Sequence, residues 1–330
     1  MTRVKIALLG AAHVHAPGYA AWLQAQPDVE FIGFSEDNPQ YARDFAAAPH
    51  LPLAQLLALN PHGVIICSEN AKHRALTEAA AQAGAHILCE KPISTTLEDA
   101  QAMRRACQHS GVSLHVAYPL RYSPAVQELR QLISMGDLGE ILAYSGINHS
   151  ICPDRDRAWF SDPALAGGGA GMDHIVHLAD LLFSFGERVD SVYAQLRPVP
   201  ELVLPEHAGV DAVGLVTLRL ASGAGATIDC SWSRPRSYPR WGHLKLDVIG
   251  TRGLQSLDAF AESINVTTPG GHHWAGYGPD LNAAMLRDFI HACQGQAAPL
   301  LADAEAGEET LKIVLAAYAS SECNAPVSLS

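Results

Sequence analysis

Residues 63–92 read GVIICSENAKHRALTEAAAQAGAHILCEKP, and this stretch decides the fold class. Its two apolar runs, at 63–68 and 86–89, flank a helical segment that stops at Gly84. Strands that read as unbroken apolar runs are typical of a parallel sheet covered on both faces. The stretch therefore predicts a strand–helix–strand unit of an open α/β sheet.

The same alternation continues on both sides of this stretch. Further strand candidates are VKIALLG from residue 4, VEFIGFSED from residue 29 and SLHVAY from residue 113. A helix over 96–111 should begin at a cap, Thr95 or Thr96, and end at Gly111. Because crossovers between parallel strands are right-handed, the pattern predicts a doubly wound, Rossmann-type parallel sheet over residues 1–118.

The second part of the chain, residues 119–330, has a different pattern. From about residue 140 several strand candidates alternate apolar and polar residues, as an antiparallel sheet with one covered face does. One helix candidate, at 171–186, interrupts them, and two more, at 279–295 and 306–322, close the chain. We expect a second α/β domain that packs against the first without a flexible linker.

Composition limits the possible partners. The chain has 330 residues, a net charge of −12 and seven cysteines without a C-x-x-C pair. The negative charge argues against nucleic acid or an anionic membrane as partner, and the cysteine count favours a reducing compartment. The N-terminus reads as a strand rather than a signal peptide, and no apolar run reaches a membrane-spanning length of about 18 residues. We expect a cytoplasmic protein with a small-molecule partner.

In an open α/β sheet, ligands bind beyond the carboxyl ends of the strands. The loop after the first strand, GAAHVHAPG at 10–18, keeps only Gly10 of the G-x-G-x-x-G pattern. We expect it to hold a pyrophosphate through backbone N–H groups at a helix N-terminus, and an ordinary strand–helix turn is the alternative. The N–H groups concerned are those of Ala12, His13 and Val14. The pair His13 and His15 could suggest a metal, but we expect none here.

Acidic residues follow the second strand. Glu36 stands 26 residues after Gly10, close to the roughly 20-residue spacing of the acid that binds the adenosine ribose. Asp37 follows it, and two acids would repel a 2′-phosphate. This favours NAD over NADP. A solvated acidic turn is the alternative.

The loop after the fourth strand carries Glu90, Lys91 and Pro92. These residues should lie at the same sheet edge as Gly10 and Glu36. Proline restricts the backbone of the residue before it, which would hold Lys91 in place. A lysine there can donate a hydrogen bond to a substrate hydroxyl. The alternative is an ion pair between Glu90 and Lys91.

The helix candidate at 171–186 carries two polar groups on one face. Asp173 and His177 are four residues apart, and Asp180 lies on nearly the same face. A carboxylate beside an imidazole can act as an acid–base pair or as half of a metal site, to which His174 could be recruited. The alternative is that these side chains only cap the helix or pair with each other.

The sequence resembles the Gfo/Idh/MocA family, the glucose–fructose oxidoreductase and inositol dehydrogenase group. The motif EKP at 90–92 follows the fourth strand, and CSENAKH resembles the family's T-P-N-x-x-H loop, with glutamate in place of its proline. GGGAGMDHIVHLADLL at 167–182 resembles a family helix, and DLGEILAYSG and AGEETLKIVLAAYAS match in order. The departure from the family pattern is the first loop, which lacks two fingerprint glycines.

The resemblance implies a Rossmann domain followed by an α/β domain with a large open, mostly antiparallel sheet. It also implies NAD(P)-dependent oxidation or reduction of a sugar, cyclitol or related polyol. The cofactor-binding residues we expect are Gly10, Ala12, His13, Val14, Glu36, Ser68, Asn70, His73, Glu90 and Lys91. The catalytic residues we expect are Lys91, Asp173 and His177, with His177 as base, Lys91 as hydrogen-bond donor and Asp173 as a substrate contact.

Other residues could line the substrate side, with a structural role as the alternative: Tyr118, Arg121, His149, Arg155 and Trp159. Arg155 and Arg157 leave a sugar acid open as substrate. The segment His272–Trp274 reads as a loop of the pocket or of an oligomer contact. An open sheet also favours a homodimer or homotetramer.

Three other functions stay open on the sequence alone. One is an enzyme of the same fold that uses NAD transiently for elimination or glycosidic cleavage. Another is a non-catalytic, NAD-dependent sensor. The last is a metal-dependent hydrolase.

Overall fold

The computed structural model describes residues 3–45, 48–153, 157–240 and 242–329 of the chain, with the side chains of Asp44 and His272 left out. The chain forms two compact units. Unit 1 comprises Met1–Pro119, Ala164–Gly167 and Asn282–Leu311, and unit 2 comprises Leu120–Pro163, Gly168–Leu281 and Lys312–Ser330. A boundary between residues 118 and 119 stays a prediction, because two later segments group with unit 1.

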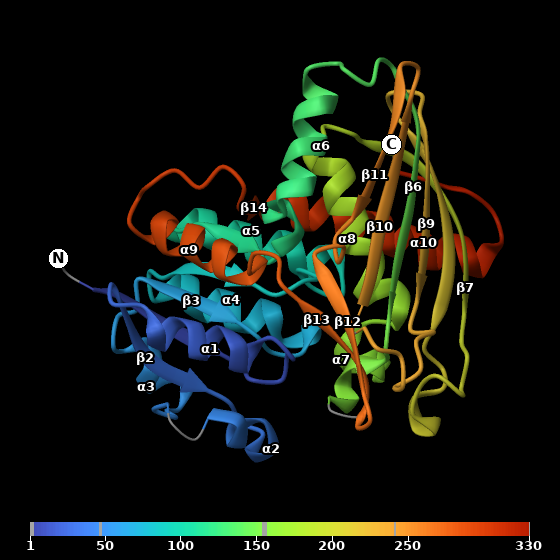
Figure 1. The fold of residues 1–330 in the computed structure, drawn as a ribbon. Coiled ribbons are helices and arrows are strands. Elements are labelled where there is room, and N and C mark those ends of the chain that lie inside the picture. Colours follow the sequence, from blue (N-terminus) through green and yellow to red (C-terminus); the bar gives the residue numbers. More distant parts are fainter. Residues whose placement is uncertain (1–2, 46–47, 154–156, 241, 330) are drawn as a thin grey trace. The chain divides into compact units, whose positions relative to one another are not determined.

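Unit 1 contains a six-stranded sheet in the order β14-β5-β4-β3-β1-β2 (Figure 1). The strands are β1 (Val4–Leu9), β2 (Val29–Ser35), β3 (Gly63–Ile66), β4 (His86–Cys89), β5 (Leu114–Val116) and β14 (Ala302–Asp303). The first five pair in parallel, and β14 joins β5 antiparallel. Buried apolar residues fill β3 completely. The predicted Rossmann-type sheet is confirmed.

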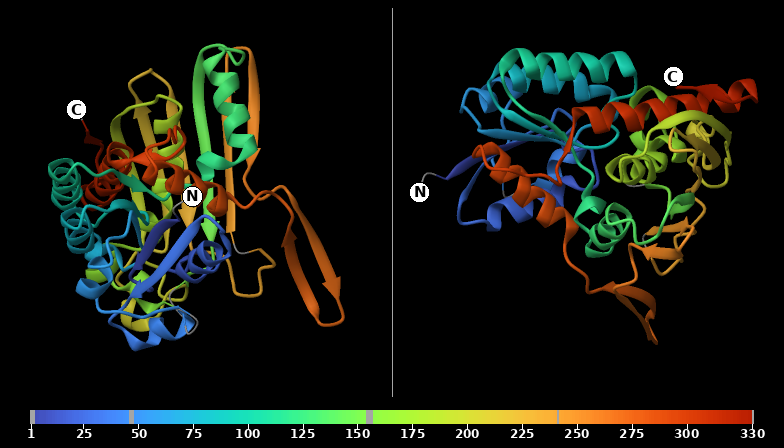
Figure 2. Two further views of the ribbon diagram at one scale, coloured as in Figure 1. Left: turned by 90° about the vertical axis from the view of Figure 1, so that its left-hand side faces the viewer. Right: turned by 90° about the horizontal axis from the view of Figure 1, so that it is seen from above.

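Helices cover both faces of this sheet. They are α1 (Ala16–Ala25), α2 (Pro39–Ala42), α3 (Leu53–Leu57), α4 (His73–Gln82), α5 (Leu97–Ser110) and α9 (Leu281–Cys293). Helices α4 and α5 lie side by side on one face and α1 lies on the other (Figure 2). The predicted ends of α5 are confirmed, because the Thr96 hydroxyl accepts the N–H of Asp99 at 3.1 Å and Gly111 has φ +69°.

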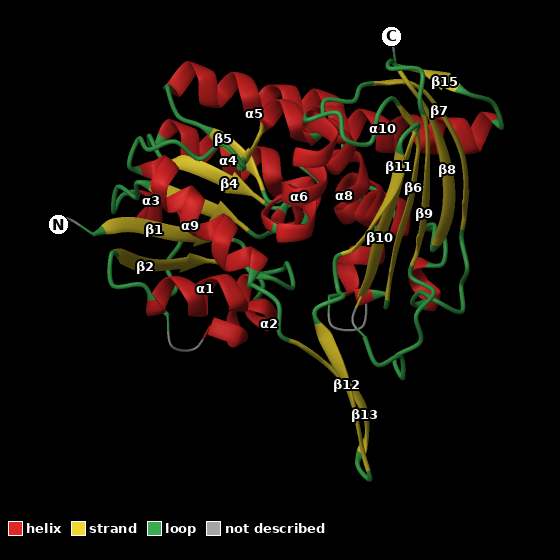
Figure 3. Ribbon diagram, turned by 45° about the horizontal axis from the view of Figure 1, so that its top comes forward, coloured by secondary structure: helices red, strands yellow, loops and turns green. Residues whose placement is uncertain are grey.

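Unit 2 contains a seven-stranded sheet in the order β11-β10-β6-β9-β8-β7-β15 (Figure 3). The strands are β6 (Ile141–Ser150), β7 (Val189–Arg197), β8 (Val213–Leu220), β9 (Gly225–Ser231), β10 (Gly242–Gly250), β11 (Gly253–Asp258) and β15 (Val327–Ser328). Only β6 and β9 pair in parallel among the described strands of this sheet. The expectation of a mostly antiparallel sheet is confirmed.

A separate hairpin corrects one sequence-based expectation. Strands β12 (Ser263–Thr268) and β13 (Gly271–Gly276) pair only with each other, and they extend away from the large sheet (Figure 3). Residues 272–274, expected to be a loop, therefore lie within a strand. The two glycines that suggested a loop are Gly270, in the turn between β12 and β13, and Gly271, the first residue of β13.

Helix α8 (Ala170–Ser184) packs on one face of the large sheet, against β6, β8 and β9. Gly146 of β6 permits this contact, since a Cβ there would lie 2.6 Å from Leu178. The other helices are α6 (Pro124–Ser134), α7 (Pro163–Ala166) and α10 (Ala304–Cys323). The sequence analysis missed α6. Over the described residues, the helices are too short or too polar to span a membrane.

Candidate active site

The turn between β1 and α1 lies directly against the end of β3. Gly10 has φ +79°, and a Cβ at this position would lie 2.6 Å from Ser68. The backbone N–H of His13 donates to the Cys67 carbonyl at 2.9 Å. This corrects the expectation that the His13 N–H faces a pyrophosphate, since the sheet already uses this donor. The turn is thus held rigidly at the carboxyl edge of the sheet.

Glu36 closes the same turn from the end of β2. Its carboxylate accepts the N–H of Ala11 at 2.7 Å and the N–H of Asn38 at 2.8 Å, and the residue is 7% exposed. A carboxylate offers about four acceptor positions, so these two bonds leave capacity for ribose hydroxyls. Glu36 therefore combines a structural role with the position that the sequence analysis gave it.

His73 joins the loop after β3 to the loop after β4. Its ring is fully buried, with Nε2 lying 3.3 Å from the Ser68 carbonyl and Nδ1 lying 3.1 Å from the Pro92 carbonyl. Burial lowers the pKa of His73 and outweighs the opposing carbonyls and Glu90. His73 thus positions the loop that carries Lys91, rather than offering a side chain to a ligand.

Asn70 presents an unused acceptor at this edge. Its Nδ2 donates to the Ala166 carbonyl at 2.9 Å, while its buried Oδ1 has no hydrogen-bond donor within the described part of the chain. A buried acceptor without a donor is costly, and a ligand N–H or O–H would satisfy it. Together with the Gly10 turn and Glu36, this atom is one of the groups at this edge that a bound ligand could contact.

The loop after β4 buries both of its charged residues. Glu90 is 0% exposed and Lys91 is 6% exposed. The Glu90 carboxylate lies 2.9 Å from His15 Nδ1 and 3.5 Å from His13 Nδ1. Burial alone would raise the pKa of Glu90, but His13, His15 and Lys91 together hold it well below its usual range. Glu90 is therefore a carboxylate. The Lys91–Pro92 bond is cis.

In unit 2, the N-terminus of α8 is capped by a residue that the sequence analysis missed. Asp211 accepts the N–H of Gly169 at 2.9 Å and that of Gly171 at 2.6 Å, and it accepts the Tyr318 hydroxyl at 2.5 Å. A Cβ at Gly169 would lie 1.8 Å from the Asp211 carbonyl oxygen. The glycine run thus allows the backbone to lie close to the segment before β8. The spacing of residues within the run could not have predicted this contact.

Asp173 and His177 are the partly accessible residues of α8 between 171 and 180, where every other residue is buried. Trp232 Nε1 donates to Asp173 Oδ2 at 3.2 Å, and His174 Nε2 lies 3.2 Å from the same oxygen. Because these contacts orient the carboxylate, Asp173 is presented in a fixed position. The shared face predicted from their spacing is present.

Two predicted substrate residues are buried and make other contacts. The Tyr118 hydroxyl lies 2.7 Å from Thr310 Oγ1, and Tyr118 is 2% exposed. Trp159 is also 2% exposed and stacks on Phe160 with ring centroids 4.1 Å apart. Aromatic residues in such positions serve the core, so we do not assign either one to substrate binding. Arg155 lies outside the described residues.

Arg121 forms a buried ion pair instead of an open cationic site. Its Nη2 donates to Asp180 Oδ1 at 2.6 Å and its Nε donates to Oδ2 at 2.9 Å. Asp180 is 1% exposed. This paired geometry ties the segment after β5 to α8. It also explains why Asp180 does not join the accessible face of Asp173 and His177.

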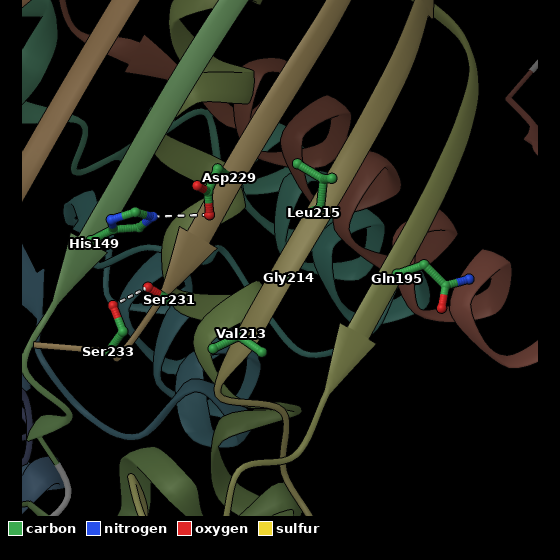
Figure 4. A pocket seen from close by; sticks show the side chains of 8 residues that line it. All are labelled: His149, Gln195, Val213, Gly214, Leu215, Asp229, Ser231 and Ser233. Atoms are coloured by element: carbon green, nitrogen blue, oxygen red, sulfur yellow. Dashed lines mark hydrogen bonds and ion pairs between the residues drawn. The ribbon is translucent and has the colours of Figure 1, made fainter.

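His149 lies on the face of the large sheet opposite to α8. Its neighbours Asn148 and Ser150 both bond to His174 of α8, and successive side chains of a strand point to opposite faces. His149 pairs with Asp229 at 2.9 Å and lines an open hollow of about 390 Å³ (Figure 4). The expectation that His149 lines the same site as Asp173 and His177 is therefore wrong.

Comparison with protein families gives two matches. A model described as "Oxidoreductase family, NAD-binding Rossmann fold" matches residues 4–118. A model described as "GFO/IDH/MocA C-terminal domain" matches residues 126–255. The two matches lie in the order expected from the sequence motifs, and each falls on the corresponding sheet.

Two of the curated relatives are a levoglucosan dehydrogenase and an inositol 2-dehydrogenase. Levoglucosan dehydrogenase of Pseudarthrobacter phenanthrenivorans is 29% identical over 214 residues, which cover 58% of this chain and 54% of that protein. Inositol 2-dehydrogenase of Rhizobium meliloti is 24% identical over 314 residues, or 93% of this chain and 90% of that protein. The chain spans about half the length of several curated relatives that it matches.

Solved structures share the fold over the whole chain. The structure of GenD2 from gentamicin A biosynthesis in complex with NAD superposes with a TM-score of 0.88 at 22% identity. It covers 100% of this chain and 97% of GenD2.

Proposed function

Because the chain belongs to the Gfo/Idh/MocA family of oxidoreductases, we propose that it transfers a hydride between a nicotinamide cofactor and a hydroxyl-bearing carbon of a sugar, cyclitol, related polyol or sugar acid. The observation that carries the proposal is the pair Asp173 and His177, partly accessible on a stretch of helix that is otherwise buried. A carboxylate and an imidazole in this arrangement suit proton transfer at a hydroxyl.

The edge of unit 1 supports the choice of cofactor. The Gly10 turn, Glu36 and the unsatisfied Oδ1 of Asn70 are the groups that would hold the dinucleotide. When bound, the nicotinamide accepts or returns the hydride. Glu36 and Asp37 at the end of β2 favour NAD over NADP, because both would repel a 2′-phosphate.

The side chains divide the proton chemistry between them. His177 takes the hydroxyl proton, since imidazole is the side chain suited to general-base work near neutral pH. We propose that the Lys91 ammonium donates a hydrogen bond to a substrate oxygen and stabilises the charge that develops on it. Asp173, oriented by Trp232, binds a neighbouring hydroxyl.

The function is tested by rates of NADH formation with a panel of polyols, sugars and sugar acids. Lys91→Ala and His177→Ala should each lower turnover by about 10²–10⁴-fold while NAD still binds. The double variant should lose less than the product of the two single losses, because the effects of residues that serve one reaction step are not additive. Lys245→Ala, an exposed lysine beside Asp258, is the control and should keep full turnover.

Two results would reject this function. Full turnover in both single variants would remove Lys91 and His177 from the reaction. Product that forms without net NADH would instead favour the transient use of NAD for elimination or cleavage.

Cofactor choice is tested by thermal stabilisation, since a ligand that binds the folded chain raises its melting temperature. NAD should raise it more than NADP at equal concentration. Asp37→Ala should reduce the difference between the melting-temperature shifts with NAD and with NADP, because it removes one charge that repels the 2′-phosphate. Asp37 is exposed, so the change should leave the turn intact. Stronger stabilisation by NADP would reverse the assignment.

We also propose that the chain forms a homodimer or homotetramer through the face of the large sheet opposite to α8. Large apolar side chains on that face are exposed: Tyr193, Leu215, Ile249 and Leu254. Tyr193, Leu215 and Ile249 each follow a residue that is buried on the helix side of the sheet, and Leu254 pairs with Ile249 on the neighbouring strand. Light scattering should find an oligomer, and Leu215→Glu should dissociate it. A monomeric wild-type chain would refute this.

A further inference from the structure

A compact group of three metal-binding side chains lies beside the turn between β1 and α1. His13 and His15 come from that turn, and Glu90 comes from the end of β4. One ligand atom from each lies within 4.8 Å of the other two. No second group of three His, Cys, Asp or Glu residues meets this condition in residues 3–45, 48–153, 157–240 and 242–329.

We propose that His13, His15 and Glu90 bind one divalent transition-metal ion, such as Zn²⁺, with one coordination position left open. Two imidazoles and one carboxylate form a ligand set that zinc uses in sites with an open fourth position. Nitrogen and oxygen ligands of this kind favour zinc, cobalt or manganese over calcium. The site lies wholly within unit 1 and does not depend on the proposed hydride transfer.

The distances suit an ion at the centre of the group. His15 Nδ1 lies 2.9 Å and His13 Nδ1 lies 3.5 Å from Glu90 Oε1. Ligands bound tetrahedrally to zinc at about 2.0–2.1 Å stand about 3.3 Å from each other. The two observed distances to Glu90 Oε1 lie on either side of that value, so small shifts of these side chains would bring the three ligand atoms to zinc-binding distances.

The hydrogen bonds also favour a cation. The backbone N–H of His15 donates to His13 Nδ1 at 3.3 Å, so this nitrogen acts as an acceptor with a lone pair. The same nitrogen faces a carboxylate oxygen whose residue is 0% exposed. A divalent cation bound here would take the lone pair of His13 Nδ1 in place of the long hydrogen bond from the His15 N–H, and it would balance the charge of the buried carboxylate.

The group is partly open to solvent and is held by a rigid turn. The side chains of His13 and Glu90 are each 1% exposed, whereas that of His15 is 24% exposed. An ion could therefore enter beside His15 and bind water or a substrate oxygen there. The hydrogen bond from the His13 N–H to the Cys67 carbonyl fixes the turn that carries both histidines.

The experiment uses the full chain without a polyhistidine tag, freed of metal with a chelator and then titrated with Co²⁺ and with Zn²⁺. The visible absorption of bound Co²⁺ and the heat of Zn²⁺ binding are measured without NAD or substrate. One ion per chain should bind. His15→Gln and Glu90→Gln should each weaken binding by at least about 100-fold, since even outer-shell changes cost 10–100-fold.

The control is His291→Gln, which should bind the metal as the wild type does. His291 also lies beside a carboxylate, Asp288, at 3.8 Å, but it has no place in a group of three. Circular dichroism checks that each variant folds. If the buried change Glu90→Gln prevents folding, the result with His15→Gln alone decides the test.

Absence of stoichiometric binding would show that a proton fills the role and would overturn the proposal. Binding that persists in a folded His15→Gln variant, or that falls equally in His291→Gln, would also overturn it. Because no turnover is measured, a failure here leaves the proposed hydride transfer to its own test.

Discussion

The turns that open α1 and α8 are both closed by a carboxylate, but the two carboxylates come from different distances along the chain. Glu36 accepts the N–H of Ala11, 25 residues earlier, from the end of the next strand. Asp211 accepts the N–H of Gly169, 42 residues earlier, from the segment before β8. The first acid belongs to a known spacing within one strand–helix–strand unit, while the second meets its helix only through the fold.

The comparison predicts that Asp211 matters most to stability. Asp211→Ala removes the acceptor of two helix N–H groups and of the Tyr318 hydroxyl, all in a buried place. Each unsatisfied donor costs about 1–3 kcal/mol, so we expect a loss of about 4 kcal/mol in urea unfolding. Asp229→Ala in the same unit, at a half-exposed aspartate, should cost about 0.5 kcal/mol or less. Equal effects would remove the special role of Asp211.

The turn of unit 1 should depend on its glycine. Gly10→Ala places a methyl group 2.6 Å from Ser68 and also strains a positive φ, so we expect a loss of about 3 kcal/mol. Gly111→Ala has a similar φ of +69° with no atom within 4 Å, and it should cost only about 1 kcal/mol. The free energies of unfolding of the two variants, measured by chemical denaturation, separate the cost of the steric contact with Ser68 from the cost of the positive φ. Similar losses would mean that the approach to Ser68 is unimportant.

The carboxylate of Glu36 should contribute less than that of Asp211. Glu36→Gln keeps one acceptor oxygen but turns an amide N–H₂ toward a backbone N–H, so about 1.5 kcal/mol should be lost. Asp37→Asn, next to it and exposed, is the matched control and should change the unfolding free energy by less than about 0.5 kcal/mol. If Glu36→Gln lowered the unfolding free energy as much as Asp211→Ala does, the two carboxylates would contribute equally to stability and the predicted difference would be wrong.

The smallest effect concerns pH. Burial lowers the pKa of His73 from 6.5, so below that value the unfolded chain binds more protons than the folded chain. Stability should therefore fall as pH drops below about 6.5, by up to about 1.4 kcal/mol per pH unit from this group. His73→Gln should flatten the pH dependence of the unfolding midpoint, while His62→Gln, at an exposed histidine, should not. Parallel pH curves for His73→Gln and the wild type would contradict this.

The sequence predicted features that depend on neighbours in the chain. The caps of α5, the parallel strands and the shared face of Asp173 and His177 all follow from local spacing. Helix α6 was not predicted, although Pro124 stands at its first position, directly after the cap residue Ser123. A proline at the first helical position is a start signal that was available.

Contacts between distant segments could not be predicted. Glu90, which groups with His13 and His15, is 75 positions after His15, so the H-x-H pattern alone did not indicate a site. Tyr118 and Trp159 could not be recognised as buried, because aromatic residues occur both in cores and in pockets. The pairing of Arg121 with Asp180 could not be predicted, because these residues are 59 positions apart.

The alternation along β6 has a consequence for mutational screens. Asn148 and Ser150 bond to His174, while His149 between them points to the other surface of the sheet. Substitutions along this one strand should therefore sort by odd and even position into two phenotypes. Even positions should disturb the helix that holds Asp173, and odd positions should alter only what the outer surface binds.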